Sequence, residues 1–163
     1  MTRPLFYAKS WFRAKKRATE LWSAGQARAA HRAGATYTVL VDSPDRPSAF
    51  IDVTPTFVGV SFLDDRLREG LTYQFQLVEP GSLFLSMATH REFDGESDRV
   101  RSGTSYMFGR DGTVRIRREH LAPHRLETAT STTDVSGNHT AAPEFGNYDG
   151  PLAVDVIGPR ERR

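Results

Sequence analysis

The stretch Leu71–Met87, with the sequence LTYQFQLVEPGSLFLSM, decides the fold of this 163-residue chain. Its first half alternates apolar and polar residues, which is the pattern of a strand with one buried face. The sequence Glu79-Pro80-Gly81 then supplies a tight turn, because proline presets φ at one turn position and glycine tolerates a positive φ at the next. After the turn, apolar residues again occupy alternate positions. The stretch predicts a β-hairpin at the centre of an antiparallel sheet.

Segments of the same character follow one another on both sides of this hairpin, from residue 36 to residue 135. They are separated by turns rich in glycine, proline and aspartate, of which Asp111-Gly112 is the strongest hairpin signal. Seven or eight short strands at regular spacing predict a mainly β fold of the α+β kind. We expect an antiparallel meander that curls into a barrel or a strongly bent sheet. Its last strand, from His124 to Val135, is rich in threonine and typical of an edge strand.

One N-terminal amphipathic helix is expected before the sheet, over residues 10–33. Ser10 is a suitable N-cap, and Gly34 suits the position just past the C-terminus. Between them, apolar residues recur at spacings of three, four and seven, which gives one stripe that includes Trp11 and Trp22. We interpret residues 1–163 as a single domain made of this helix, the sheet over 36–135, a closing segment over 136–157 and a tail over 158–163.

Charge is unevenly distributed along the chain. Up to Arg32 there are eight basic residues and one acidic residue, a net charge of +7, whereas the remainder has a net charge of −5. Two interpretations of this basic arm remain open. Either it packs against the acidic body of its own chain, or its cations bind the phosphates of a nucleic acid. The candidates for such phosphate contacts are Arg13, Lys16 and Arg17.

The sequence lacks the marks of most catalytic and cofactor sites. Without cysteine there is no disulfide, thiolate zinc site or cysteine nucleophile, and no phosphate-binding loop, dinucleotide fingerprint or hydrolase motif is present. Pro123 separates His120 from His124, so a helical metal site built from this pair is not expected. These absences favour a protein that is not an enzyme but leave an acid–base site open, and no cofactor or metal is expected. No segment resembles a secretory signal or a membrane span, which favours a cytoplasmic protein without a membrane partner.

The strand after the central hairpin carries one ambiguous polar pair, His90 and Glu92. If their face lines an interior, they could form a small-molecule or acid–base site together with Tyr73 or Tyr106. In the opposite arrangement, Leu83 and its alternate neighbours face the core and His90 faces water. The two arrangements exclude each other on a regular strand, because its side chains point to opposite faces in turn.

Two further groups of residues are candidates for contact with a partner protein. Acidic side chains gather in the turn after residue 63 and in the polar loop 94–103, at Asp64, Asp65, Asp94, Glu96 and Asp98. Two aromatic residues of the closing segment, Phe145 and Tyr148, either pin this segment over the open end of the core or present an anchor to the partner.

Two passages near the C-terminus are similar to a known kind of protein. One is YMFGRDGTV, from Tyr106 to Val114, and the other is DVSGN, from Asp134 to Asn138, followed by PEFGNY, from Pro143 to Tyr148. Together they resemble the end of small actinobacterial immunity-like proteins of toxin–immunity loci. The resemblance covers roughly a third of the chain. It implies a non-catalytic, cytoplasmic protein that binds another protein.

Three functions are therefore carried forward from the sequence. The first is a protein-binding module, of the immunity-like or accessory kind, that neutralises a partner through an exposed patch. The second is a small lipocalin-like barrel that binds or transforms a small molecule in secondary metabolism, and it predicts an enclosed cavity of about 300–1,000 Å³. The third is nucleic-acid binding through the basic arm.

Overall fold

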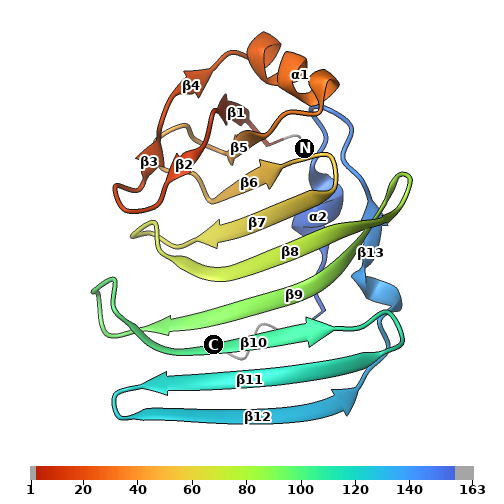
Figure 1. Ribbon diagram of the computed structural model, residues 1–163. Coiled ribbons are helices and arrows are strands. Elements are labelled where there is room, and N and C mark those ends of the chain that lie inside the picture. Colours follow the sequence, from red (N-terminus) through yellow and green to blue (C-terminus); the bar gives the residue numbers. More distant parts are fainter. Residues whose placement is uncertain (1–2, 157–163) are drawn as a thin grey trace.

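Residues 3–156 are described by the structure, a computed structural model (Figure 1). The expected tail at 158–163 lies outside these described residues. Eleven strands form one antiparallel sheet in the order β12-β11-β10-β9-β8-β7-β6-β5-β1-β4, with β13 paired to β9 off this path. Eight of them make an uninterrupted meander: β5 (Tyr37–Val41), β6 (Ala49–Val53), β7 (Phe57–Leu63), β8 (Glu69–Glu79), β9 (Ser82–Phe93), β10 (Val100–Phe108), β11 (Thr113–Leu121) and β12 (His124–Thr132).

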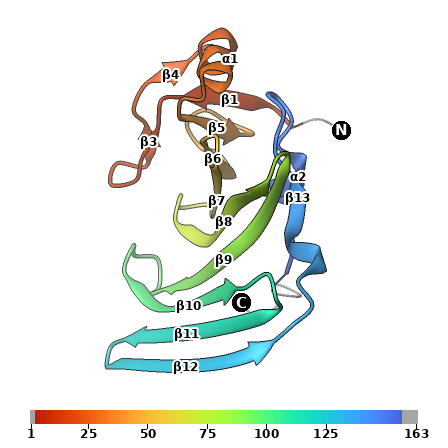
Figure 2. The ribbon, with the colours of Figure 1, turned by 45° about the vertical axis from the view of Figure 1, so that its right-hand side comes forward.

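The sheet is strongly bent but does not close into a barrel (Figure 2). Its two edges are β12 and the two-residue strand β4 (Leu21–Trp22), and these do not pair with each other. The expected mainly β meander is thus confirmed in its bent-sheet form, and the barrel is wrong. Both ends of the chain pack on the open sheet. Strand β1 (Leu5–Ala8) extends the sheet beside β5, and the C-terminal segment covers the concave side of the bend, which pairing between the edge strands would enclose in a barrel.

The N-terminal helix is shorter than expected. Helix α1 spans Ala24–Ala33, and residues 11–22 form β2 (Trp11–Phe12), β3 (Arg17–Ala18) and β4 instead. Ser23 is the true N-cap, because its side chain accepts a bond from the Gln26 amide while the Gln26 side chain accepts one from the Ser23 amide. The expected end is correct, with Gly34 at φ 70°. The helix predicted over residues 10–22 is wrong. Trp11 and Trp22 pack in different apolar clusters, so they do not lie on one apolar stripe of a helix.

The central hairpin is present as predicted, formed by β8 and β9, but it contains a β-bulge that the sequence does not reveal. Leu77 pairs with Leu83 and Phe75 with Leu85, whereas the next pairs are Gln74–Met87 and Tyr73–Ala88. Ser86 is the extra residue, and its hydroxyl donates to the Gln74 carbonyl at 3.2 Å. One inserted residue shifts the alternation by one position. Both the leucines before the bulge and the residues Ala88 and His90 after it therefore lie on one face.

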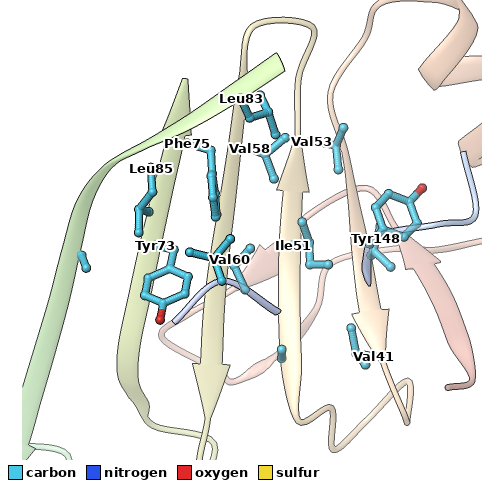
Figure 3. Close-up of a cluster of buried hydrophobic side chains, with 14 of the residues drawn as sticks. Val41, Ile51, Val53, Val58, Val60, Tyr73, Phe75, Leu83, Leu85 and Tyr148 are labelled. Carbon is cyan, nitrogen blue, oxygen red and sulfur yellow. The ribbon is translucent and has the colours of Figure 1, made fainter. Parts of the chain in front are cut away.

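We call this the inner face, because the C-terminal segment packs on it. The segment contains η1 (Ser136–Asn138), β13 (His139–Ala141) and α2 (Asp149–Ala153). Figure 3 shows aliphatic and aromatic side chains of β5–β9 side by side on this face, with Tyr148, which is 1% exposed, at one side of the group. At the other end of the segment, the buried Asn138 side chain donates to the Leu85 carbonyl at 2.9 Å. The last described part of the predicted closing segment also packs on the core, through Leu152, Val154 and Val156.

The opposite, outer face is covered only near the N-terminus. There Trp11, in the β2–β3 hairpin, stacks on Phe50 with 5.5 Å between ring centroids, next to Ala8 and Leu40. Beyond β7 the outer face carries mainly polar side chains. The sheet therefore has one apolar, covered half, made of β1 and β5–β9, and one open half, made of β10–β12, whose inner face is described next.

Candidate functional site

A polar cleft opens on the inner face where the C-terminal cover ends. It has a volume of about 240 Å³ and lies across β9, β10 and β11. Every lining side chain is polar or titratable: His90, Glu92, Ser102, Thr104, Tyr106, Arg118 and His120. Polar side chains grouped beside an apolar core indicate a functional site more strongly than exposed polar residues elsewhere on the surface do. We name it the inner cleft.

The strand register builds the inner cleft as cross-strand rows. Glu92 pairs with Ser102, which pairs with His120 on the next strand. One step along, His90, Thr104 and Arg118 form a second row, and Ala88, Tyr106 and Ile116 form a third. The bulge at Ser86 puts these rows on the same face as the leucines before it. The two arrangements considered for this strand are therefore both realised, since the leucines face the core and His90 and Glu92 face the cleft.

Hydrogen bonds hold several of these side chains in place. The Ser102 hydroxyl donates to Glu92 Oε1 at 3.1 Å, and Arg101 lies 3.4 Å from the same oxygen. Arg118 Nε donates to Thr104 Oγ1 at 3.1 Å. On the β12 side, His120 Nε2 is 3.4 Å from Glu127 Oε1. Among the described residues no carboxylate lies within 4 Å of the Arg118 guanidinium, so this exposed cation is available to a ligand.

Three of the four acid–base candidates meet in the inner cleft. His90, Glu92 and Tyr106 line it, whereas Tyr73 is wholly buried one strand away, with its ring against Phe62 and Phe75. Sequence reasoning missed the remaining residues of the lining. The polar alternation of Ser102, Thr104 and Tyr106 marks a half-polar strand face, but the predicted loop over 94–103 included Ser102 and obscured it. Strand β10 in fact begins at Val100.

The acidic partner-binding candidates lie at one end of the sheet, together with basic residues of the N-terminal arm. Asp98 is 2.7 Å from Lys16 Nζ, Glu96 is 2.6 Å from Arg66, and Asp64 is 2.8 Å from Arg68. Asp94 is 3.8 Å from Arg99. Asp65 is exposed in the same turn. The acidic loops are thus not a bare negative surface, because four of the five carboxylates face cations of their own chain.

The basic arm packs on its own body, as one of its two interpretations predicts. Arg13 pairs with Glu69 at 3.0 Å and Lys16 with Asp98, while Arg17 is exposed on β3. Arg13 and Lys16 border a depression of about 470 Å³ that also includes Arg68 and Arg91. Arg68 is committed to Asp64, and Arg91 donates to the Glu69 carbonyl and Thr72 at 3.4 Å. Because its cations are already bonded within the chain, we do not assign a ligand site to this larger depression.

Asp52 gives this cluster a pH dependence. It lies on the outer face of β6, where the Thr38 hydroxyl donates to Oδ1 at 2.8 Å and Arg13 is 3.8 Å from Oδ2. Burial raises the pKa of the Asp52 carboxyl above its usual value, although the Thr38 bond and Arg13 oppose the shift. An acid whose pKa is higher in the folded state is more easily charged when unfolded. Stability therefore falls as the pH rises through this pKa, and the loss persists at neutral pH.

We expect Asp52→Asn to unfold at a higher temperature than the wild type at about pH 7, because the amide keeps an acceptor for Thr38 and carries no charge. The difference should vanish below about pH 4, where the wild-type carboxyl is protonated in both states. Thermal unfolding followed by circular dichroism across this range measures both effects. An Asn variant that is less stable at neutral pH would show that the bond to Arg13 outweighs the burial of charge.

The aromatic pair of the closing segment lies inside the protein. Tyr148 shares a hydrogen bond of 2.8 Å with the Tyr37 hydroxyl, which also lies 2.9 Å from His31 Nδ1. Phe145 stacks on Tyr7 at 5.1 Å between centroids, and the Arg28 guanidinium lies over its other side at 4.6 Å. These contacts favour the interpretation in which the two residues pin the segment. Tyr148 is buried and cannot serve as an exposed anchor, whereas Phe145 is half-buried.

Other candidate sites receive no support from the geometry. His120 and His124 each approach a glutamate, Glu127 at 3.4 Å and Glu119 at 3.0 Å, and do not converge. Within residues 3–156, no group of three or more histidines and carboxylates could hold a metal ion. No helix in this part of the chain is long and apolar enough to cross a membrane. No protein-family model, curated protein or solved structure matches the chain.

Proposed function

We propose that this chain is a protein-binding module and that the inner cleft is where it holds a segment of its partner. One observation carries the proposal. Among residues 3–156, the core on the inner face extends over β5–β9 to Phe108 and Val114, whereas the neighbouring rows of β9–β11 line a cleft. A sheet that needed only a core would have apolar or small residues at this border. This sheet instead presents two histidines, a glutamate and an arginine without a carboxylate partner among the described residues.

The dimensions of the cleft favour a protein segment over an enclosed small molecule. Its volume of about 240 Å³ lies below the range of about 300–1,000 Å³ that is usual for small-molecule pockets. All seven lining side chains carry a polar group, whereas ligand pockets are lined mainly by hydrophobic and aromatic side chains. A loop or strand of a partner that carries hydroxyl and carboxylate groups could contact Arg118, His90 and His120 together. A toxin that this protein neutralises is the concrete version, in line with the resemblance of the 106–148 region.

Two adjacent arginines of β11 allow a matched test. Arg118 lines the cleft, whereas Arg117 pairs with Ser105 and therefore points to the outer face. The tagged wild type, Arg118→Glu and Arg117→Glu proteins are each purified from the host, and the bound proteins are quantified by mass spectrometry. We expect a partner that is retained by Arg117→Glu and lost, by tenfold or more, from Arg118→Glu. A partner retained equally by both variants would contradict the cleft as the binding surface.

A small-molecule site in the same cleft is the second candidate, because His90, Glu92 and Tyr106 do line one cleft. Histidine and glutamate are among the side chains that most often act as general acids and bases. Native mass spectrometry of the protein from its host distinguishes the two candidates. A bound small molecule that is lost in His90→Ala would favour this second function, whereas its absence together with a bound protein would favour the first.

A further inference from the structure

The free edge of β12 is unlike the other edge of the sheet. All nine residues of β12, HRLETATST, are exposed, and the strand pairs only with β11. The opposite edge, β4, has two residues and leads directly into α1. Short strands, prolines, lysines and bulges are the usual devices that stop sheet edges from pairing with another chain. Strand β12 has no proline, glycine or lysine, and its register with β11 has no shift.

Backbone groups along β12 are arranged to accept another strand. The Thr133 amide donates to the Gly112 carbonyl at 2.8 Å, in the register that β11 and β12 share. Residues of an antiparallel strand alternate between bonding to one neighbour and pointing to the other side. The amide and carbonyl groups of five residues therefore point away from β11: His124, Leu126, Thr128, Thr130 and Thr132.

The side chains of β12 are complementary to a second copy of the same strand. Leu126, 46% exposed, is flanked by Arg125 and Glu127, which carry opposite charges. In an antiparallel pair with a two-fold axis at Leu126, this leucine lies against Leu126 of the partner subunit. Arg125 then lies opposite Glu127 of the partner subunit, and the reciprocal pair repeats the contact. Opposite charges directly across a strand pair stabilise it, whereas like charges destabilise it. An axis at Glu127 would set two glutamates against each other.

We propose that two copies of this chain pair edge to edge through β12, with the two-fold axis at Leu126. The pairing joins the two bent sheets into one continuous sheet with both inner clefts on the same side. Six backbone hydrogen bonds form, two each at the Leu126 pair and at the two His124–Thr128 pairs. This inference is independent of the partner protein proposed for the inner cleft, because the cleft residues lie on β9–β11.

Molecular mass in solution, measured by light scattering after size-exclusion chromatography over a range of concentrations, tests the pairing. We expect a concentration-dependent dimer for the wild type and a monomer for Leu126→Lys, which places two ammonium groups against each other at the axis. Leu21→Lys is the matched control, because Leu21 is 60% exposed on the opposite edge and its variant should remain dimeric. A wild type that is monomeric throughout, or larger than a dimer, would overturn the proposal.

Charge exchange tests the position of the axis. Arg125→Glu should weaken the dimer about tenfold, or about 1.4 kcal/mol, since both reciprocal pairs become glutamate against glutamate. The double variant Arg125→Glu/Glu127→Arg restores opposite charges across the axis and should restore the wild-type dissociation constant. Each variant is first shown to unfold at a temperature close to that of the wild type, which is expected because both positions are exposed on β12. If the double variant stays as weak as the single one, the axis is not at Leu126.

Discussion

Tyr148→Ala is expected to lower the free energy of unfolding by about 3–5 kcal/mol, the range for truncating a fully buried aromatic side chain. The ring is 1% exposed and lies on the aliphatic side chains of the inner face (Figure 3). Its hydroxyl also bonds to Tyr37 across a sequence separation of 111 residues. For a chain of this length the melting temperature should fall by at least about 6 °C. Urea unfolding followed by circular dichroism measures the change.

Tyr106→Ala supplies the matched control for this prediction. It removes a tyrosine side chain that belongs to the inner face itself and lies in the open inner cleft, where the ring is half-buried. We expect a loss of less than half that of Tyr148→Ala, because less apolar surface returns to water. Equal losses at the two positions would mean that the closing segment does not contribute to the core as its burial indicates.

Alkaline pH is expected to unfold this protein through its tyrosine cluster. Burial, together with the neighbouring Tyr148, raises the pKa of Tyr7 to about 12, and burial also raises the pKa values of Tyr37 and Tyr148 above the usual value of 10. The unfolded chain therefore loses these protons first. The stability that these buried hydroxyls contribute is fully present below about pH 10 and decreases as the pH rises toward 12. Tyr7 alone accounts for about 2.7 kcal/mol over two pH units, and the other two phenols add to the loss.

Urea unfolding at a series of pH values from about 8 to 11.5 tests this expectation, with phenolate absorbance recorded on the same samples. Tyr7→Phe should lose less stability than the wild type between the two ends of the series, since one of the three shifted groups is gone. A free energy of unfolding that stays constant up to pH 11.5 would contradict the burial of these hydroxyls. Phenolate absorbance of more than one tyrosine before unfolding begins would contradict it as well, since Tyr106 is the one tyrosine that is not buried.

The meander was predictable from the sequence because its strands and turns carry local signals. Alternating apolar residues and the turns at Pro80-Gly81 and Asp111-Gly112 place β8–β11 within a few residues of their true bounds. The stretch over 10–22 gave no such signal. Its apolar spacing fits a helix, but the segment forms the β2–β3 hairpin instead. In this hairpin Arg13 pairs with Glu69 and Lys16 with Asp98, and these contacts with distant parts of the chain leave no local signal.

The inner cleft was only partly predictable. His90, Glu92 and Tyr106 were predicted because polar residues alternate with apolar ones on their strands. That His90 and Glu92 share the inner face with the leucines before them, however, depends on the bulge at Ser86. Nothing in Leu85-Ser86-Met87 marks an inserted residue, since the apolar positions continue at the expected spacing. Arg118 and His120 were hidden for a different reason. They join the site through strand register, which is set by pairing across three strands and leaves no mark on one strand alone.

The bulge at Ser86 allows β9 to carry one extra residue without any change in its partners. Without Ser86, Leu85 would still pair with Phe75, Met87 with Gln74 and Ala88 with Tyr73. His90 and Glu92 would therefore remain on the inner face, now on a regular strand. The gain or loss of this one codon is absorbed at the bulge and does not reach β10–β12. In this architecture a binding surface built from the register of several strands survives a change in reading length of three nucleotides in its central strand.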